Sequence, residues 1–181
     1  LVSLAEATVI PHVVHVIREG KSYAEAVNLV ARRDCRQEFL FLGADDLKFE
    51  RGWDVAALAK FADPSVHVVG TNDLHHPEHE AGTHATHYVI RRRYLDLMTG
   101  TIDRCAYVLY PYDHNYTDTE FIQTAQFRGC YAYARDSRTE HCHAVWGKNP
   151  WDDVYTKGHR RVNEDRAIFE SRQPLWGRQP V

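Results

Sequence analysis

The sequence predicts a single α/β domain, in which helices cover both faces of a sheet. The chain has 181 residues, enough for one well-packed domain and short for two. Phe39 to Leu42 form an apolar run without polar alternation, which is typical of a strand buried on both faces. Other short apolar strands alternate with segments of helical spacing, and no internal repeat or low-complexity linker divides the chain.

Composition argues against several classes of protein. No apolar run approaches the ~20 residues that a membrane-spanning helix needs. The net charge of -3 argues against a protein whose whole surface binds nucleic acid. The 4 cysteines show no Cys-x-x-Cys spacing, so we expect neither a zinc knuckle nor a disulfide framework, and a reducing cytoplasm is the predicted location.

The chain is expected to open with a helix followed by a strand. Apolar residues recur with helical spacing over residues 1–8, and Pro11 closes that element. Residues 12–17, HVVHVI, are rich in β-branched side chains and predict a strand.

Residues 20–22, Gly-Lys-Ser, precede a helix as a phosphate-binding P-loop does. A P-loop also needs a glycine five residues before its Gly-Lys pair. His15 stands at that position, inside the predicted strand. The spacing therefore argues against a nucleotide-hydrolase P-loop.

Ser22 is better interpreted as the N-cap of a helix over residues 23–33. Glu25, three residues further on, would complete a capping box. Asn28 lies outside the apolar stripe of this helix, so its amide faces either a ligand or solvent.

Asp45 and Asp46 follow the strand Phe39 to Leu42 after Gly43. Ligands of open α/β sheets bind beyond the carboxyl ends of the strands. Two adjacent carboxylates there suit a divalent metal that carries phosphates. A solvated Asp-Asp turn is the alternative.

The next elements repeat this arrangement. A helix is expected over residues 54–61, stopped by Asp63 and Pro64. Residues 66–69 predict another short buried strand, which ends in the polar stretch 70–73 at the expected carboxyl edge.

Residues 75–87, HHPEHEAGTHATH, contain five histidines and two glutamates. Such side chains could bind zinc, but no pair has the His-Glu-x-x-His spacing of a helical zinc site. Pro77 and Gly82 favour a loop. The segment therefore predicts either a substrate-lining or merely polar loop, or a metal site.

The second half of the chain is expected to hold strands over residues 86–90 and 131–134, and helices over residues 94–98, 117–128 and 154–171. Residues 107–116 are rich in tyrosine and predict a loop suited to stacking on a sugar or base, or to anchoring on the surface. The last helix and its tail would form either a lid or a cover over the core.

Three polar clusters occur at strand ends or helix starts, namely Asp45 with Asp46, Asp118 with Glu120, and His141 with His143. In this order, the chain resembles the GT-A fold glycosyltransferases of the family 2 type, most closely compact bacteriophage-encoded ones. GADD at residues 43–46 resembles the DxD-like motif of that family. HYVIRRRYLDLMTGTID at 87–103 resembles the strand and helix before the acceptor site, and NYTDTEF at 115–121 the acidic motif that opens the catalytic helix.

The resemblance covers roughly residues 20–151 and implies a GT-A, Rossmann-like fold. Its sheet would be mixed and mainly parallel, flanked by helices in a single domain over residues 1–181. Residues 1–70 would form the donor-nucleotide half, 71–151 the acceptor and catalytic half, and 152–181 a C-terminal helix and tail. The strand that opens this family's fold would precede Leu1, so base and ribose recognition is not assigned.

The resemblance also implies an activity, the inverting transfer of a sugar from a UDP- or GDP-sugar to a hydroxyl group. The acceptor would be a protein, modified DNA or a glycan, and a phage-encoded enzyme would work in the host cytoplasm. The alternatives are a non-catalytic carbohydrate- or nucleotide-binding module of the same fold, and a histidine-rich metallohydrolase built on residues 75–87.

Roles for single residues follow from the same resemblance. Mn²⁺ or Mg²⁺ would bind Asp46 with His141 or His143, and Asp118 would be the catalytic base. Glu120 would orient the acceptor. The residues implied at the donor nucleotide are Lys21, Ser22, Tyr23, Asn28 and Asp45, and those lining the acceptor approach are His84, His114 and Tyr116.

Overall fold

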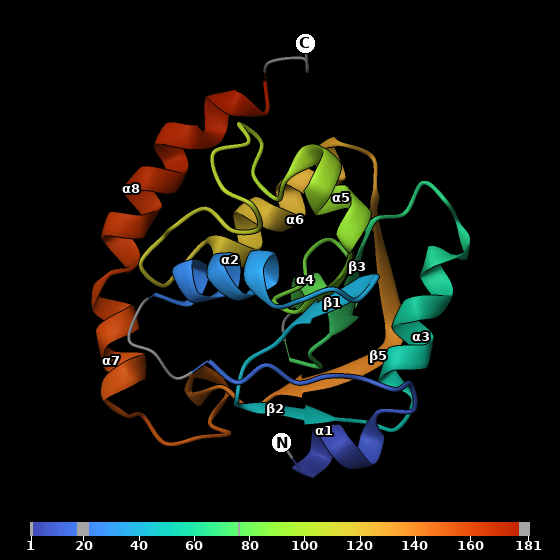
Figure 1. Ribbon diagram of the computed structural model, residues 1–181. Coiled ribbons are helices and arrows are strands. Elements are labelled where there is room, and N and C mark those ends of the chain that lie inside the picture. Colours follow the sequence, from blue (N-terminus) through green and yellow to red (C-terminus); the bar gives the residue numbers. More distant parts are fainter. Residues whose placement is uncertain (1, 18–21, 76, 178–181) are drawn as a thin grey trace.

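The computed structural model describes residues 2–17, 22–75 and 77–177, in which five strands form one sheet (Figure 1). The strands are β1 (Phe39–Leu42), β2 (Leu47–Phe49), β3 (Val68–Asn72), β4 (Tyr88–Arg91) and β5 (Tyr131–His141), in the spatial order β1-β4-β3-β5-β2. Helices pack on both faces of this sheet, so the predicted α/β class with a single domain is confirmed.

The sheet is mixed, and the expectation of a mainly parallel sheet is not confirmed. β4 pairs antiparallel with β1 and β3, and β2 pairs antiparallel with β5. Among the described strands only β3 and β5 form a parallel pair. The reason lies between β3 and β4, where the short helix α4 (Pro77–Glu80) turns the chain back instead of crossing over the sheet. β1, β3 and β5 nevertheless run in the same direction.

One face of the sheet is covered by α2 (Tyr23–Arg33), α5 (Arg92–Met98) and α6 (Thr117–Phe127). Ser22 caps α2 through its side chain, which accepts a hydrogen bond from the backbone N–H of Glu25 at 3.4 Å, as the sequence predicts. Phe121 of α6 stacks on Tyr88 of β4 with ring centroids 4.6 Å apart. This packing fixes the start of α6 relative to the sheet.

The opposite face is covered by α1 (Val2–Ala7), α3 (Trp53–Ala59) and the 3-10 turn η1 (Lys60–Ala62). Phe41 of β1 packs against Trp53 of α3, with ring centroids 4.6 Å apart. The side chains of β1 thus meet apolar groups on both faces, which confirms the prediction of a doubly buried strand.

The predicted strand over residues 12–17 is wrong. This segment is extended, exposed and without a strand partner among the described residues. The chain before it is held instead by Asp54, whose Oδ2 accepts hydrogen bonds from the N–H groups of Val9 and Ile10 at 2.9 and 2.6 Å. A β-branched pattern records local preference, whereas strand formation also needs a neighbouring strand.

Two other strands end later than predicted. β3 starts at Val68 and continues to Asn72, and β5 extends to His141 instead of ending at residue 134. The register of the β3 and β5 pair shifts between Thr71 and Asn72, so the polar residues 135–137 form an irregularity inside β5. His141 therefore lies on the sheet itself.

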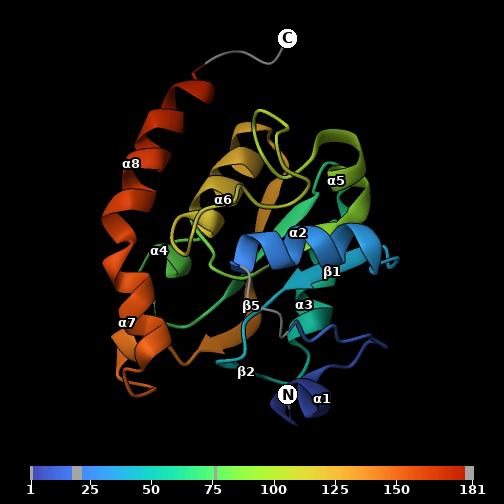
Figure 2. The ribbon, with the colours of Figure 1, turned by 60° about the vertical axis from the view of Figure 1, so that its left-hand side comes forward.

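The C-terminal region forms two helices along one side of the molecule (Figures 1 and 2). After the 3-10 turn η2 (Ala144–Trp146), they are α7 (Asp153–Arg160) and α8 (Val162–Arg172), followed by η3 (Gln173–Leu175). The single helix expected over residues 154–171 is interrupted at Arg161. Each described helix is too short or too polar to cross a lipid bilayer.

Candidate active site

Polar residues from three strands meet at one edge of the sheet. Because β1, β3 and β5 run in the same direction, the residues that follow them reach the same edge. The N–H of His141 donates to the carbonyl of Asp73 at 3.2 Å, and the N–H of Cys142 donates to the carbonyl of Asp46 at 2.8 Å. The sequence-predicted Asp46 and His141 are thus brought together, with Asp73 beside them.

Asp46 and His141 face one another through their side chains. Asp46 Oδ2 lies 3.2 Å from His141 Nε2, and it accepts a hydrogen bond of 2.8 Å from the hydroxyl of Tyr155 on α7. Burial alone would raise the pKa of Asp46, but the hydrogen bonds and charge of these neighbours lower it to about 2. The carboxylate is therefore ionised at neutral pH.

The other oxygen of Asp46, Oδ1, is buried and has no hydrogen-bond partner within the described part of the chain. Buried carboxylate oxygens are normally paired with a protein group, water or an ion. The described residues contain no group of three or more metal-binding side chains, so a cation held by Asp46 and His141 would need further ligands from outside the described residues.

His87, at the start of β4, is a central residue of this edge that the sequence did not single out. It is 4% exposed, and its ring centroid lies 4.8 Å from that of His141 with the planes nearly perpendicular. Burial and then the positive charge of His141 lower the pKa of His87 to about 3. The nearby carboxylates, including Asp46 and Asp118, act in the opposite direction but do not offset this effect. His87 is therefore a neutral imidazole beside His141.

Asp118 opens α6 and pairs with His84, at 3.3 Å between Oδ2 and Nε2. Its Oδ1 accepts the backbone N–H of Thr119 at 2.8 Å. Burial raises the pKa of Asp118, but the hydrogen bond and charge of His84 outweigh it and lower the pKa below its usual value. Burial alone would lower the pKa of His84, but the hydrogen bond and charge of Asp118 outweigh burial, so the pKa is raised. The two residues stabilise each other's charged form.

Tyr23 connects the start of α2 with this edge. Its hydroxyl donates to the carbonyl of Gly43 at 3.4 Å. Tyr23 is 40% exposed. Asp45 is exposed beside the edge, Ser22 caps α2, and Lys21 lies outside the described residues.

Asn28 holds the backbone instead of facing a ligand. Its Oδ1 accepts the N–H groups of Val108 and Leu109 at 2.7 and 3.1 Å, and its Nδ2 donates to the carbonyl of Leu109 at 2.7 Å. These bonds use both ends of the amide to join α2 to the tyrosine-rich loop. The prediction that Asn28 contacts the donor is therefore corrected to a structural role.

Glu120 is also separated from Asp118. It is 1% exposed, and it accepts hydrogen bonds from Arg172 at 2.7 and 2.8 Å and from the hydroxyl of Tyr112 at 2.6 Å. Residues two positions apart point to different sides of a helix, so the two acids of this helix start diverge. The expectation that Glu120 orients an acceptor is corrected: Glu120 anchors α8 to the core.

The remaining predicted residues lie towards the C-terminal helices. The pKa of His143 is lowered by burial and then by the charge of His141, and its Nδ1 accepts the backbone N–H of Val145 at 3.1 Å. His141 is thus the histidine that faces Asp46. Tyr116 stacks on Phe169 of α8, with ring centroids 4.9 Å apart. His114 lines a pocket beside α7.

The histidines of residues 75–87 do not gather in the part of the chain that the structure describes. His75 pairs with Glu140 at 3.1 Å, His84 with Asp118, and His87 packs against His141. Tyr155 and Asp73 are site residues that sequence reasoning missed. The polar stretch 70–73 at a predicted strand end was the available signal for Asp73, whereas nothing local marks Tyr155.

Comparisons of the chain with protein-family models, with curated proteins and with solved structures gave no significant match.

Proposed function

We propose that the protein is an inverting, metal-dependent glycosyltransferase that moves a sugar from a UDP- or GDP-sugar to a hydroxyl group. The observation that carries the proposal is the unpaired, buried Oδ1 of Asp46 beside His141, together with the ionised Asp118 nearby. His87 packs against His141, which faces Asp46, and His84 of the same segment pairs with Asp118. A GT-A type of fold would give this edge the role of a donor site.

The donor side of the site needs a positive partner for a diphosphate. Mn²⁺ or Mg²⁺, when bound by Asp46 and His141, would neutralise the charge that develops on the departing nucleoside diphosphate. Tyr155 holds the Asp46 carboxylate by its hydrogen bond, and His87 packs against the ring of His141. Both contacts orient the two ligands before the donor arrives.

The acceptor side needs a base for one proton. Asp118 would take the proton of the acceptor hydroxyl as that oxygen attacks the anomeric carbon, and a single displacement inverts the configuration there. His84 fixes the carboxylate through Oδ2 and keeps it ionised. Asp118 does not need a raised pKa if proton transfer occurs late, after the bond to the leaving group has stretched.

The test is turnover of a panel of UDP- and GDP-sugars with Mn²⁺, measured as release of the nucleoside diphosphate in the presence of hydroxyl acceptors. Asp118→Asn is expected to lower transfer by about 10²–10⁴-fold, the usual contribution of a positioned base, while nucleotide binding stays unchanged. Asp136→Asn, at an exposed position of β5, is the matched control and should retain full activity.

Full transfer by Asp118→Asn would refute the assignment of the base. No turnover with any donor would refute catalysis. If nucleotide still binds in that case, the protein is instead the non-catalytic binding module of the same fold.

A further inference from the structure

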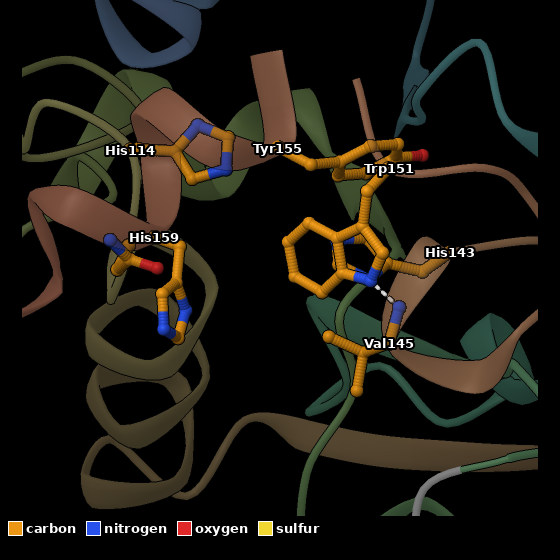
Figure 3. Close-up of a pocket in the computed structure, with 7 residues that line it drawn as sticks. His114, His143, Val145, Trp151, Tyr155 and His159 are labelled. Carbon is orange, nitrogen blue, oxygen red and sulfur yellow. Dashed lines mark hydrogen bonds between the residues drawn. The ribbon is translucent and has the colours of Figure 1, made fainter. Parts of the chain in front are cut away.

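A pocket of about 110 Å³ lies between the loop before α6, the turn η2 and the start of α7 (Figure 3). It is lined by His114, Asn115, His143, Val145, Trp151, Tyr155 and His159. In Figure 3, His114 and His159 stand on one side, and Trp151 and His143 stand on the other. The pocket therefore has aromatic walls that face one another across an open space.

The lining points to an uncharged, hydrogen-bonding ligand. It contains no carboxylate, lysine or arginine, so it offers no fixed charge for a phosphate or an ammonium group. Its three histidines do not form a metal-binding group among the described residues. An imidazole and a carboxamide each combine donor and acceptor atoms, as a sugar hydroxyl does. This chemistry suits neighbouring hydroxyl groups on one ring.

Trp151 provides the apolar surface that such a ring needs. It is 54% exposed, so much of its surface is accessible to a ligand. The rings of Tyr155 and His159 stand nearly perpendicular to it, at centroid distances of 6.0 and 6.1 Å, so neither is stacked on it. The negative face of an aromatic ring attracts the weakly positive C–H groups of a pyranose.

The walls of the pocket are held in place before any ligand binds. Asp165 of α8 is 1% exposed and accepts the backbone N–H groups of residues 113–115 at 2.7 to 3.0 Å. Gly158 leaves room for the ring of His114, because a Cβ at this position would collide with that ring. A pocket fixed in this way binds with a smaller entropy cost.

Tyr155 joins the pocket to the acidic edge. The phenol ring lines the pocket, while the hydroxyl donates to Asp46 Oδ2 at 2.8 Å. His143 packs on Tyr155 and on His141, with centroids 4.5 and 5.1 Å away. A ligand in the pocket would therefore sit beside the group that anchors the donor, and next to the loop that leads into Asp118.

We propose that this pocket binds a neutral pyranose ring of the acceptor, which makes the acceptor a glycan or glycoside. The ring stacks on Trp151, and its hydroxyls hydrogen-bond polar side chains of the lining, among them His114 and Asn115. The proposal rests on the proposed function for the role of acceptor, but the binding of a pyranose does not depend on transfer.

The experiment is saturation-transfer difference NMR with methyl glucopyranoside, methyl mannopyranoside and methyl galactopyranoside, without donor or metal. At least one glycoside is expected to receive saturation at its ring protons. Trp151→Ala should lower that signal about fivefold or more, and Trp151→Phe should keep most of it. Trp146→Ala is the matched control, since Trp146 is partly exposed nearby but does not line the pocket, and its signal should not change.

No saturation of any glycoside, or equal signals for the wild type and Trp151→Ala, would overturn the proposal. A signal from UMP or GMP that disappears in Trp151→Ala, with none from the glycosides, would overturn it in favour of a nucleobase. Donor turnover is measured separately. Glycoside binding without turnover therefore refutes the transferase alone, and turnover without glycoside binding refutes the pocket alone.

Discussion

Two clusters around acidic side chains in this protein differ in how completely their polar atoms are paired. In the first, both oxygens of Glu120 and both oxygens of Asp103 accept hydrogen bonds, most of them from Arg172 of α8. In the second, Asp46 Oδ1 and His87 Nδ1 are buried without partners among the described residues. Fully paired polar groups stabilise a fold, whereas a buried polar atom without a protein partner can accept water, an ion or a ligand.

Two carboxylates that lie close together in the sequence differ in the same way. Asp118 and Glu120 occupy the same first turn of α6. Asp118 is partly exposed and paired with His84, while Glu120 is fully enclosed by Arg172 and Tyr112. We therefore expect changes at the Arg172 cluster to affect stability and changes at the Asp46 edge to affect binding.

The largest effect on stability is expected from Arg172→Met. Removing the guanidinium leaves Glu120 buried without its partner and also frees Asp103, which should lower the free energy of unfolding by about 3–5 kcal/mol. Urea denaturation at neutral pH measures this change. Arg166→Met, on the exposed side of the same helix, is the control and should cost less than about 1 kcal/mol. Equal losses for both variants would show that the Arg172 cluster is not what secures α8.

A smaller effect is expected from acid. Burial would raise the pKa of Asp103, but the hydrogen bonds and charge of Arg172, with Cys105, lower it below the ordinary 3.8. A carboxyl group with a lower pKa in the folded protein stabilises the fold above its ordinary pKa, and this contribution is lost as pH falls towards the folded value. Stability should therefore fall as pH drops below about 4.

Asp103→Asn should weaken that acid dependence while making the protein less stable at neutral pH. Urea midpoints between pH 5 and the lowest pH at which the protein stays soluble give the comparison. An unchanged slope in Asp103→Asn would assign the acid sensitivity to other carboxyl groups.

The hydrophobic and capping patterns of the sequence predicted those helices and strands whose formation depends mainly on their own residues. β1 and α2 have the expected bounds, because an apolar run and a capped amphipathic helix are complete signals by themselves. Asp46 is predictable from its place after β1, whereas His141 follows only from the family resemblance, because the strand expected there ends at residue 134 and not at His141. Residues 12–17 carried a strand pattern, but they have no neighbour to pair with among the described residues.

The rest depended on tertiary contacts that no local pattern records. His87 becomes a site residue only because the end of β5 brings His141 against it. Asn28 and Glu120 were assigned to ligands, since polar groups on a helix next to a site look the same whether they bind substrate or backbone. The spacing of Asp118 and Glu120 could have separated them, because residues two apart on a helix do not share a side.

The most direct test of the central claim comes from Asp46→Asn, which removes the negative charge of this side chain while keeping its size. Because His141 and Tyr155 stabilise the ionised carboxylate, the variant should also be less stable than the wild type at neutral pH, so each protein is compared with its own ligand-free midpoint. The measurement is the thermal unfolding midpoint with UDP or GDP, each with and without Mn²⁺. The wild type is predicted to gain several degrees only when nucleotide and Mn²⁺ are both present, and Asp46→Asn to gain none. Equal gains in the two proteins, or no gain in the wild type with either nucleotide, would contradict a metal and diphosphate site at Asp46.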